Sequence, residues 1–102
     1  MKTIKRALSP MLCFLYICFS NAANAADAQM IQQGKTLYSQ NCVFCHQADA
    51  IGKPGMAPSL TNPQLLSIAS DKFLMATIRD GRPGTSMPPY GHLGRKGITE
   101  IV

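Results

Sequence analysis

Several sequence patterns are missing from this 102-residue chain, and their absence limits the folds and functions that we expect of it. No stretch alternates apolar and polar residues over more than three positions, so the sequence does not predict β-strands. Only five residues are acidic, and they form no carboxylate pair suited to acid–base catalysis. The chain also has no glycine-rich phosphate loop and no serine–histidine arrangement. We therefore expect a helical protein without a hydrolytic or phosphate-binding site.

A long hydrophobic run is absent as well. The longest apolar stretch, residues 7–19, is too short to span a bilayer stably. It follows three basic residues and precedes the small-residue signal Ala23-Asn24-Ala25, an order typical of a secretory signal peptide. We expect residues 1–25 to be a signal peptide, residues 26–102 to form the mature domain, and the product to be periplasmic, without stable membrane insertion after cleavage. An uncleaved N-terminal anchor is the alternative.

The formal net charge of +5 falls to +2 once the signal segment is set aside. This balance gives no support for nucleic-acid binding. Five basic residues cluster in the second half of the chain, where a solvated surface is the ordinary interpretation and steering of an acidic partner is the alternative. They are Lys72, Arg79, Arg82, Arg95 and Lys96.

The cysteines that remain in residues 26–102 are Cys42 and Cys45, and His46 follows directly. Two thiols three residues apart can each add across one vinyl group of a porphyrin, and the adjacent imidazole can bind the iron. The C-x-x-C-H pattern therefore predicts one covalently bound haem c, with His46 as an axial ligand.

Three other chemistries are compatible with this cysteine pair. A thioredoxin-like dithiol would follow a strand, whereas the residues before Cys42 have a helical pattern. A zinc site would need four suitably spaced ligands, and the chain has just one further histidine, His92. A disulfide between the two cysteines is also open in an oxidising compartment.

The second axial ligand is predicted to be Met87. It lies in Gly84-Thr85-Ser86-Met87-Pro88-Pro89, where the prolines stiffen a loop that can present the thioether at a fixed angle. A thioether ligand raises the reduction potential of haem iron. His92, five residues later, is the main competitor.

Apolar spacing and capping residues predict short helices joined by loops rich in glycine and proline. Asp27, Asn62 and Ser70 are the expected N-caps, and Gly81 the expected helix end. The expected helices are residues 28–40, 63–69, 71–79 and 98–102, separated by loops at 47–60 and 82–97.

From residue 28 to residue 102 the order of these motifs resembles that of small bacterial class I c-type cytochromes. The resemblance rests on the helix ending in Tyr38-Ser39-Gln40-Asn41-Cys42, the Cys42–His46 motif, Pro58-x-Leu60 and Met87-Pro88. It implies an all-α, cytochrome c-like fold, with three to four short helices around one haem. It also implies that His46 and Met87 are the proximal and distal ligands, and that the carbonyl of Pro58 accepts a hydrogen bond from the imidazole.

The chain departs from this family pattern in three places. Gln47 and Ala57 stand where glycine is common, and both changes are interpreted as mild. The final helix is two or three turns shorter than usual and lacks the aromatic residue that packs on the equivalent of Gly34. We therefore expect a C-terminally truncated helix, as in a fragment.

The resemblance implies a protein that shuttles single electrons between redox partner proteins and is not itself an enzyme. The alternative is a haem subunit or domain of a periplasmic oxidoreductase complex. A haem enzyme would differ in having an open sixth position on the iron, where small molecules could bind.

Overall fold

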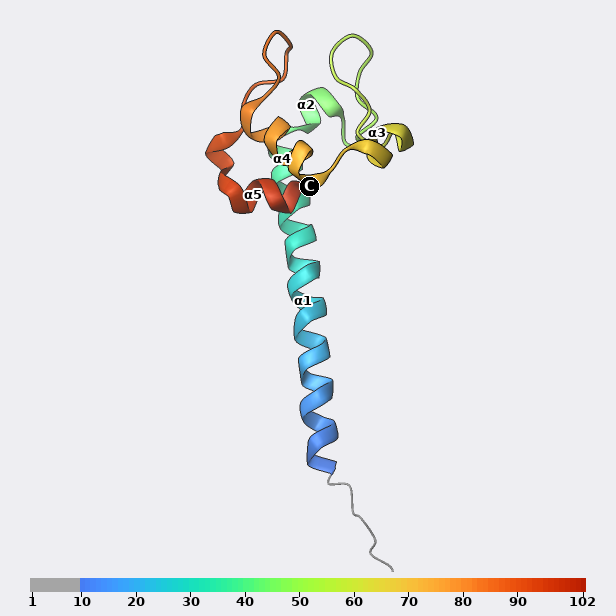
Figure 1. Ribbon diagram of the computed structural model, residues 1–102, viewed down its shortest axis with the longest axis vertical. Helices are drawn as coiled ribbons and strands as arrows, with labels where there is room; N and C mark the ends of the chain where they lie inside the picture. The colour runs from blue at the N-terminus through green and yellow to red at the C-terminus, as the bar shows by residue number, and fades with distance from the viewer. Residues whose placement is uncertain (1–9) are drawn as a thin grey trace, which may run out of the picture.

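The structure, a computed structural model, describes the backbone of residues 10–102 and the side chains of residues 22–102. The basic residues expected to start a signal peptide lie outside the described residues. Within the described part every regular element is a helix, which confirms the all-α prediction (Figure 1). The elements are α1 (Pro10–Asn41), α2 (Val43–His46), α3 (Pro63–Ile68), α4 (Asp71–Asp80), the 3₁₀ helix η1 (Gly91–Leu93) and α5 (Gly94–Ile101).

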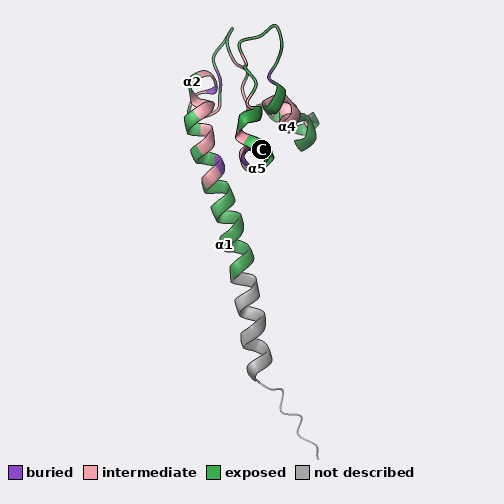
Figure 2. Ribbon diagram, turned by 90° about the vertical axis from the view of Figure 1, so that its left-hand side faces the viewer, coloured by how far each residue is buried: buried purple, intermediate pink, exposed green. Residues whose placement is uncertain are grey.

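Helix α1 is longer than the sequence predicted. A helix beginning after an N-cap at Asp27 was expected, but α1 passes through this residue without a break, so that prediction is wrong. The reason is local, because residues 22–28 are mostly alanine, the best helix former, and contain neither glycine nor proline. The described side chains before Gln33 are exposed, and packing against the rest of the molecule begins there (Figure 2). Across residues 10–102, no helix combines the length and apolar character needed to cross a membrane.

Helices α1 and α5 pack together through two glycines. A Cβ at Gly34 of α1 would overlap the backbone carbonyl of Glu100, so only glycine permits this approach. On the facing helix, a Cβ at Gly97 would lie 3.3 Å from Cδ1 of Leu37. The neighbour of Gly34 is therefore the backbone of α5. Beside these contacts lies Ile98, which is 3% exposed.

The last helix begins earlier than predicted. Residues 82–97 were expected to be loop, but η1 starts at Gly91 and α5 at Gly94. The glycines of this segment weaken a sequence-based helix assignment because glycine is a poor helix former. Here Gly97 stands in the helix because its missing side chain leaves room for Leu37.

The two helices in the middle of the chain, α3 and α4, begin where predicted and end within one residue of the predicted positions. The side chain of Asn62 accepts a hydrogen bond from the backbone N–H of Gln64 at 2.8 Å, and Pro63 is the first residue of α3. Ser70 Oγ accepts one from the N–H of Phe73 at 3.2 Å, at the start of α4. Helix α4 ends at Gly81, whose φ of +68° lies in the region that favours glycine.

Candidate haem site

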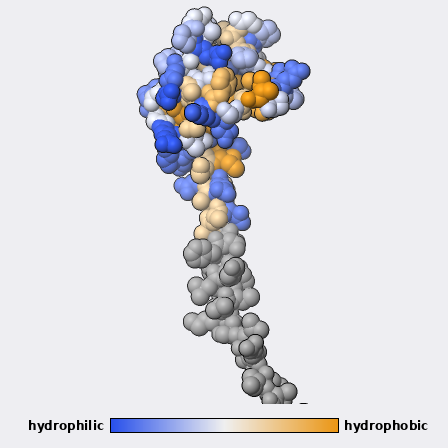
Figure 3. Space-filling view, viewed as in Figure 1, coloured by the Kyte–Doolittle hydropathy of each residue, from blue (hydrophilic) through white to orange (hydrophobic). Residues whose placement is uncertain are grey.

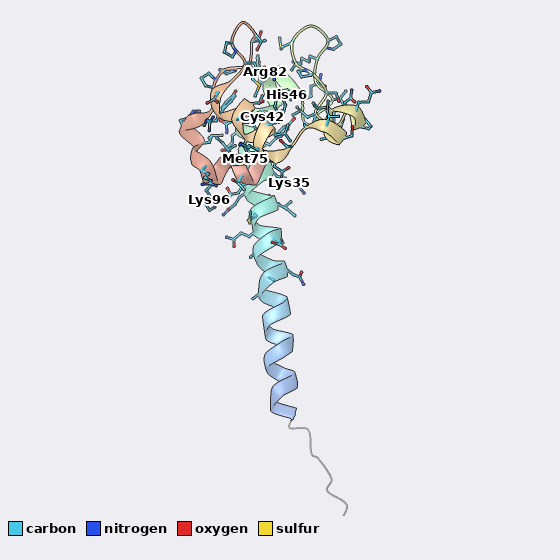
Figure 4. All side chains as sticks on the ribbon, viewed as in Figure 1. Lys35, Cys42, His46, Met75, Arg82 and Lys96 are labelled. Carbon is cyan, nitrogen blue, oxygen red and sulfur yellow. The ribbon has the colours of Figure 1, made fainter. Side chains whose placement is uncertain are left out.

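The two cysteines lie where α1 gives way to α2. The N–H of Cys42 still donates to the carbonyl of Tyr38 in α1 at 2.8 Å, while its own carbonyl accepts from the N–H groups of Cys45 at 3.2 Å and His46 at 2.9 Å. Residues three apart on one helical turn lie on the same side of it. Both thiols are free and half-buried, and Figure 4 shows Cys42 and His46 near the centre of the head that α2, α4 and α5 form at the end of α1. This arrangement offers two thiols and one imidazole to a single ligand.

Burial raises the pKa of the Cys42 thiol, and the nearby thiol of Cys45 raises it further. A dithiol oxidoreductase needs the opposite, since its attacking cysteine is activated by a lowered pKa. The pair also follows a helix, whereas a thioredoxin-like pair follows a strand. Both observations argue against the dithiol alternative.

His46 is buried, with 8% of its surface exposed, and its ring orientation is fixed. Its Nδ1 lies 3.1 Å from the carbonyl oxygen of Pro58. A carbonyl can only accept, so Nδ1 must carry a proton in this contact, and in the neutral imidazole this leaves the lone pair on Nε2. The hydrogen bond between His46 and Pro58 that the resemblance implied is therefore present, and it leaves Nε2 suited to bind a metal.

The loop that carries Pro58 folds back against His46. The N–H of Gly52 donates to the carbonyl of His46 at 2.9 Å, and the N–H of Leu60 donates to that of Ala50 at 2.8 Å. Gly52 is buried with φ +80°, and a Cβ there would overlap the carbonyl of Pro58. Glycine at this position thus lets the loop bring the Pro58 carbonyl to the imidazole.

Gln47 contributes to the site in a way that the sequence analysis missed. Its backbone has φ +66° and ψ 166°, a conformation essentially reserved for glycine. Its side-chain amide donates to the carbonyl of Gly52 at 2.7 Å, and its own carbonyl accepts from the hydroxyl of Tyr38 at 2.7 Å. The replacement of the usual glycine was the available signal, and it is less mild than the sequence analysis assumed.

Met87 lies in the loop between α4 and η1, which in Figure 1 rises on the opposite side of α2 from the loop that carries Pro58. Its carbonyl accepts from the N–H of Arg82 at 3.1 Å, and its N–H donates to Thr85 Oγ1 at 3.2 Å. The side chain is half-buried. Both contacts lie within the loop, and neither joins Met87 to His46. His92 is exposed in η1, with its ring centroid 5.9 Å from that of Tyr90.

The interior of the head suits a large apolar cofactor. Among the described hydrophobic side chains Ile98 alone is buried, and none of the large ones is fully enclosed. Apolar side chains instead reach the surface among hydrophilic ones, as on the face shown in Figure 3. Examples are Phe44 (80% exposed), Ile68 (83%) and Leu66 (56%). A domain this small needs further apolar burial to be stable, which a porphyrin held by Cys42, Cys45 and His46 would supply.

The described residues offer no comparable site for a bare metal ion. Within this part of the chain no three histidine, cysteine or acidic side chains are placed so that they could hold one metal ion. A structural zinc site needs four such ligands. The zinc alternative therefore has no ligand set among the described residues.

The helical architecture and the haem-attachment motif together define a small c-type cytochrome domain. Residues 29–102 match the family described as "Cytochrome C oxidase, cbb3-type, subunit III", and the chain belongs to this family. Membership implies covalently bound haem c.

Curated relatives fall into two groups. Over 67 residues the chain is 40% identical to the "Cbb3-type cytochrome c oxidase subunit CcoP" of Rubrivivax gelatinosus. This match covers 66% of this chain and 21% of that protein. It is 39% identical over 67 residues to "Cytochrome c55X" of Pseudomonas aeruginosa, covering 66% of this chain and 54% of that protein. It is also 39% identical over 72 residues to "Cytochrome c55X" of Stutzerimonas stutzeri, and this match covers 71% of this chain and 59% of that protein.

The chain spans less than two thirds of the length of each of these relatives. No solved structure matches the chain.

Proposed function

We propose that this protein carries single electrons on one haem c, attached through Cys42 and Cys45 and ligated by His46 and Met87. The observation that carries the proposal is the state of His46. Its ring is buried beside two free thiols, and its Nδ1 is engaged by the carbonyl of Pro58. Nε2 is therefore the one ring nitrogen left to bind iron.

Haem, when bound, supplies a reversible one-electron iron couple, and the protein sets its surroundings. The Nδ1–H···O bond to Pro58 fixes the tautomer of His46 and raises the basicity of Nε2. The thioether of Met87 favours the ferrous state. The half-buried cysteines hold the porphyrin edge in place.

Met87 is proposed as the second axial ligand over the other methionines and His92. Its side chain is half-buried, and two prolines follow it in a loop held by hydrogen bonds at both ends. His92 and Met56 are exposed, and Met56 lies in the same loop as Pro58, on the side of His46. A ligand from that loop would have to pass around the porphyrin edge to reach the opposite face.

A mobile carrier and a haem subunit of an oxidase would use the same one-electron chemistry. The chain is similar both to cytochrome c55X proteins and to a CcoP subunit of a cbb3-type oxidase. We keep a haem subunit or domain of a periplasmic oxidoreductase complex as the second candidate, because the family is described as an oxidase subunit. In either case the partners are other redox proteins.

We also propose that residues 1–25 are a signal peptide and that residues 26–102 act in the periplasm. The described side chains of α1 before Gln33 are exposed, so cleavage before Ala26 removes none of the packing described between α1 and α5. The shortened helix would still contain Gly34, Leu37 and Tyr38, which make the contacts described above.

The test is to express the full chain with haem-attachment machinery and measure the intact mass and visible spectrum of the secreted protein. We expect one haem, loss of residues 1–25 and a low-spin spectrum that carbon monoxide hardly changes after reduction. A colourless protein of bare polypeptide mass contradicts the proposal. Rapid and complete binding of carbon monoxide contradicts Met87 ligation and favours a haem enzyme.

A further inference from the structure

Gln47 occupies a backbone conformation that costs free energy for any residue with a side chain. Its φ of +66° with ψ 166° falls where glycine alone is common. It also forms the end of α2, directly after His46. A strained residue beside the proposed iron ligand persists only where the surrounding contacts hold it in place.

Two hydrogen bonds hold Gln47 from opposite directions. The hydroxyl of Tyr38 in α1 donates to its carbonyl at 2.7 Å, and its own side-chain amide donates to the carbonyl of Gly52 at 2.7 Å. We call these three residues the Gln47 clamp. A glycine at position 47 would relieve the strain but could make only the first of these bonds.

The clamp connects to His46 through Gly52. The N–H of Gly52 donates to the carbonyl of His46 at 2.9 Å, and a Cβ added at Gly52 would overlap the carbonyl of Pro58. That carbonyl accepts from Nδ1 of His46 at 3.1 Å. The contacts thus run from α1 through Gln47 and Gly52 to both sides of His46.

We propose that Gln47 is a positioning residue, which through Gly52 fixes the imidazole plane of His46 and the strength of its hydrogen bond to Pro58. This inference rests on the proposed function, in which Nε2 of His46 binds haem iron. Without the amide of Gln47, the loop at Gly52 is held less tightly, and the Nδ1–H···O bond weakens. A weaker bond makes Nε2 less basic, which destabilises ferric iron relative to ferrous iron.

The experiment compares Gln47→Leu and Gln47→Gly in the haem-loaded protein. Leucine keeps the backbone strain and removes the amide, whereas glycine removes both. Losing a residue that hydrogen-bonds directly to a metal ligand typically lowers metal affinity or activity 10- to 100-fold. Gln47 acts on His46 only through Gly52, so we expect a smaller effect, roughly a threefold shift of the ferric–ferrous equilibrium toward the ferrous state. At 59 mV per tenfold this corresponds to an increase in potential of about 30 mV in both variants. Resistance to denaturant should separate them, with Gln47→Gly more stable than Gln47→Leu.

A structural role alone would change stability without moving the potential. The second readout is therefore the paramagnetically shifted NMR resonances of the ferric protein, which report the orientation of the imidazole plane. Gln40→Leu is the matched control, since Gln40 is an exposed glutamine at the end of α1. It should leave both readouts unchanged, whereas Tyr38→Phe should shift them in the same direction as Gln47→Leu.

Two results would overturn the inference. Wild-type potential and resonances in both Gln47 variants mean that the amide does not position His46. An equal shift in Gln40→Leu means that the effect is not specific to the clamp. If the wild-type protein itself binds no haem, the proposed function fails first, which its mass and spectrum reveal before any variant is compared.

Discussion

The hydroxyl of Tyr90 donates a hydrogen bond to the backbone carbonyl of Asn41 at 3.0 Å, across 49 positions of the chain. Asn41 immediately precedes Cys42, and Tyr90 follows Met87 by three residues. The N–H of Tyr90 also donates to the carbonyl of Ile78 in α4 at 2.9 Å. This one side chain therefore links the loop of the proposed distal ligand to the start of the haem-attachment motif.

Tyr90→Phe should loosen that link while keeping the ring in place. We expect a loss of about 0.5–1.5 kcal/mol in unfolding free energy, typical of one hydrogen bond. We also expect faster displacement of Met87 by added imidazole, because its loop is less firmly held. Stopped-flow absorbance measures the displacement rate. Gln40→Leu, at an exposed position near the end of α1, is the control and should leave that rate unchanged.

Alkaline pH should lower the stability of the fold because Tyr38 and Tyr90 then lose their phenol protons. Burial, followed by nearby ionisable groups, raises the pKa of Tyr38 and of Tyr90. The folded state therefore holds these phenol protons more tightly than the unfolded chain does. Their stabilising contribution is complete below the ordinary tyrosine pKa of about 10 and is lost as pH rises through the raised values.

Guanidinium unfolding of the haem-loaded protein at increasing pH tests this expectation. In that form both cysteines are thioethers, so their charges no longer act on the tyrosines, but burial remains as the main cause. The midpoint should fall above about pH 10, and the double variant Tyr38→Phe/Tyr90→Phe should show a shallower fall. If the midpoint of the double variant falls as steeply as that of the wild type, groups other than these two tyrosines cause the loss of stability at alkaline pH.

Gly34→Ala should destabilise the contact between α1 and α5. The added Cβ would overlap the carbonyl of Glu100, so one helix has to move. Overpacking costs about 1–3 kcal/mol. Because the clash here is with backbone, we expect a cost in the upper part of that range, above the roughly 1 kcal/mol gained from the better helix propensity of alanine. Denaturant unfolding gives the difference. The neighbouring exposed Lys35→Ala is the control and should change the unfolding free energy by no more than about 0.5 kcal/mol.

The parts of the fold that the sequence predicted well are those that local chemistry decides. Asn62 and Ser70 cap helices through bonds to residues two or three positions away, so their roles can be recognised from the sequence. The start of α5 could not be recognised in this way. Gly97 is accepted in that helix because Leu37, sixty residues earlier, lies against it.

The same distinction between local and distant contacts applies to the candidate site. The Cys42–His46 motif is contiguous, so the sequence alone is enough to predict its chemistry. The contact of His46 with Pro58 was implied by the family resemblance and is present. The contacts of Gln47 and Tyr90 depend on the backbone path of loops and on distant elements, which spacing does not reveal.

Each cysteine should contribute separately to the retention of haem. Cys42→Ser and Cys45→Ser each leave one thioether link, so we expect the cofactor to stay attached through one bond but to be retained less well through denaturation. Acid–acetone precipitation followed by measurement of the absorbance left on the protein gives the retained fraction. The double variant is the control and should release all of its haem. Full retention in the double variant contradicts covalent attachment at these positions.

Met87→Ala tests the proposed distal ligand directly. Removing the thioether should open the sixth position of the iron, so carbon monoxide binds the reduced protein rapidly and completely. The reduction potential should also fall, because thioether ligation stabilises ferrous iron. His92→Ala is the matched control, and since His92 is exposed in η1, it should behave like the wild type. If Met87→Ala keeps the wild-type potential and resists carbon monoxide while His92→Ala does not, the ligand is His92, and the loop after α4 has to rearrange to deliver it.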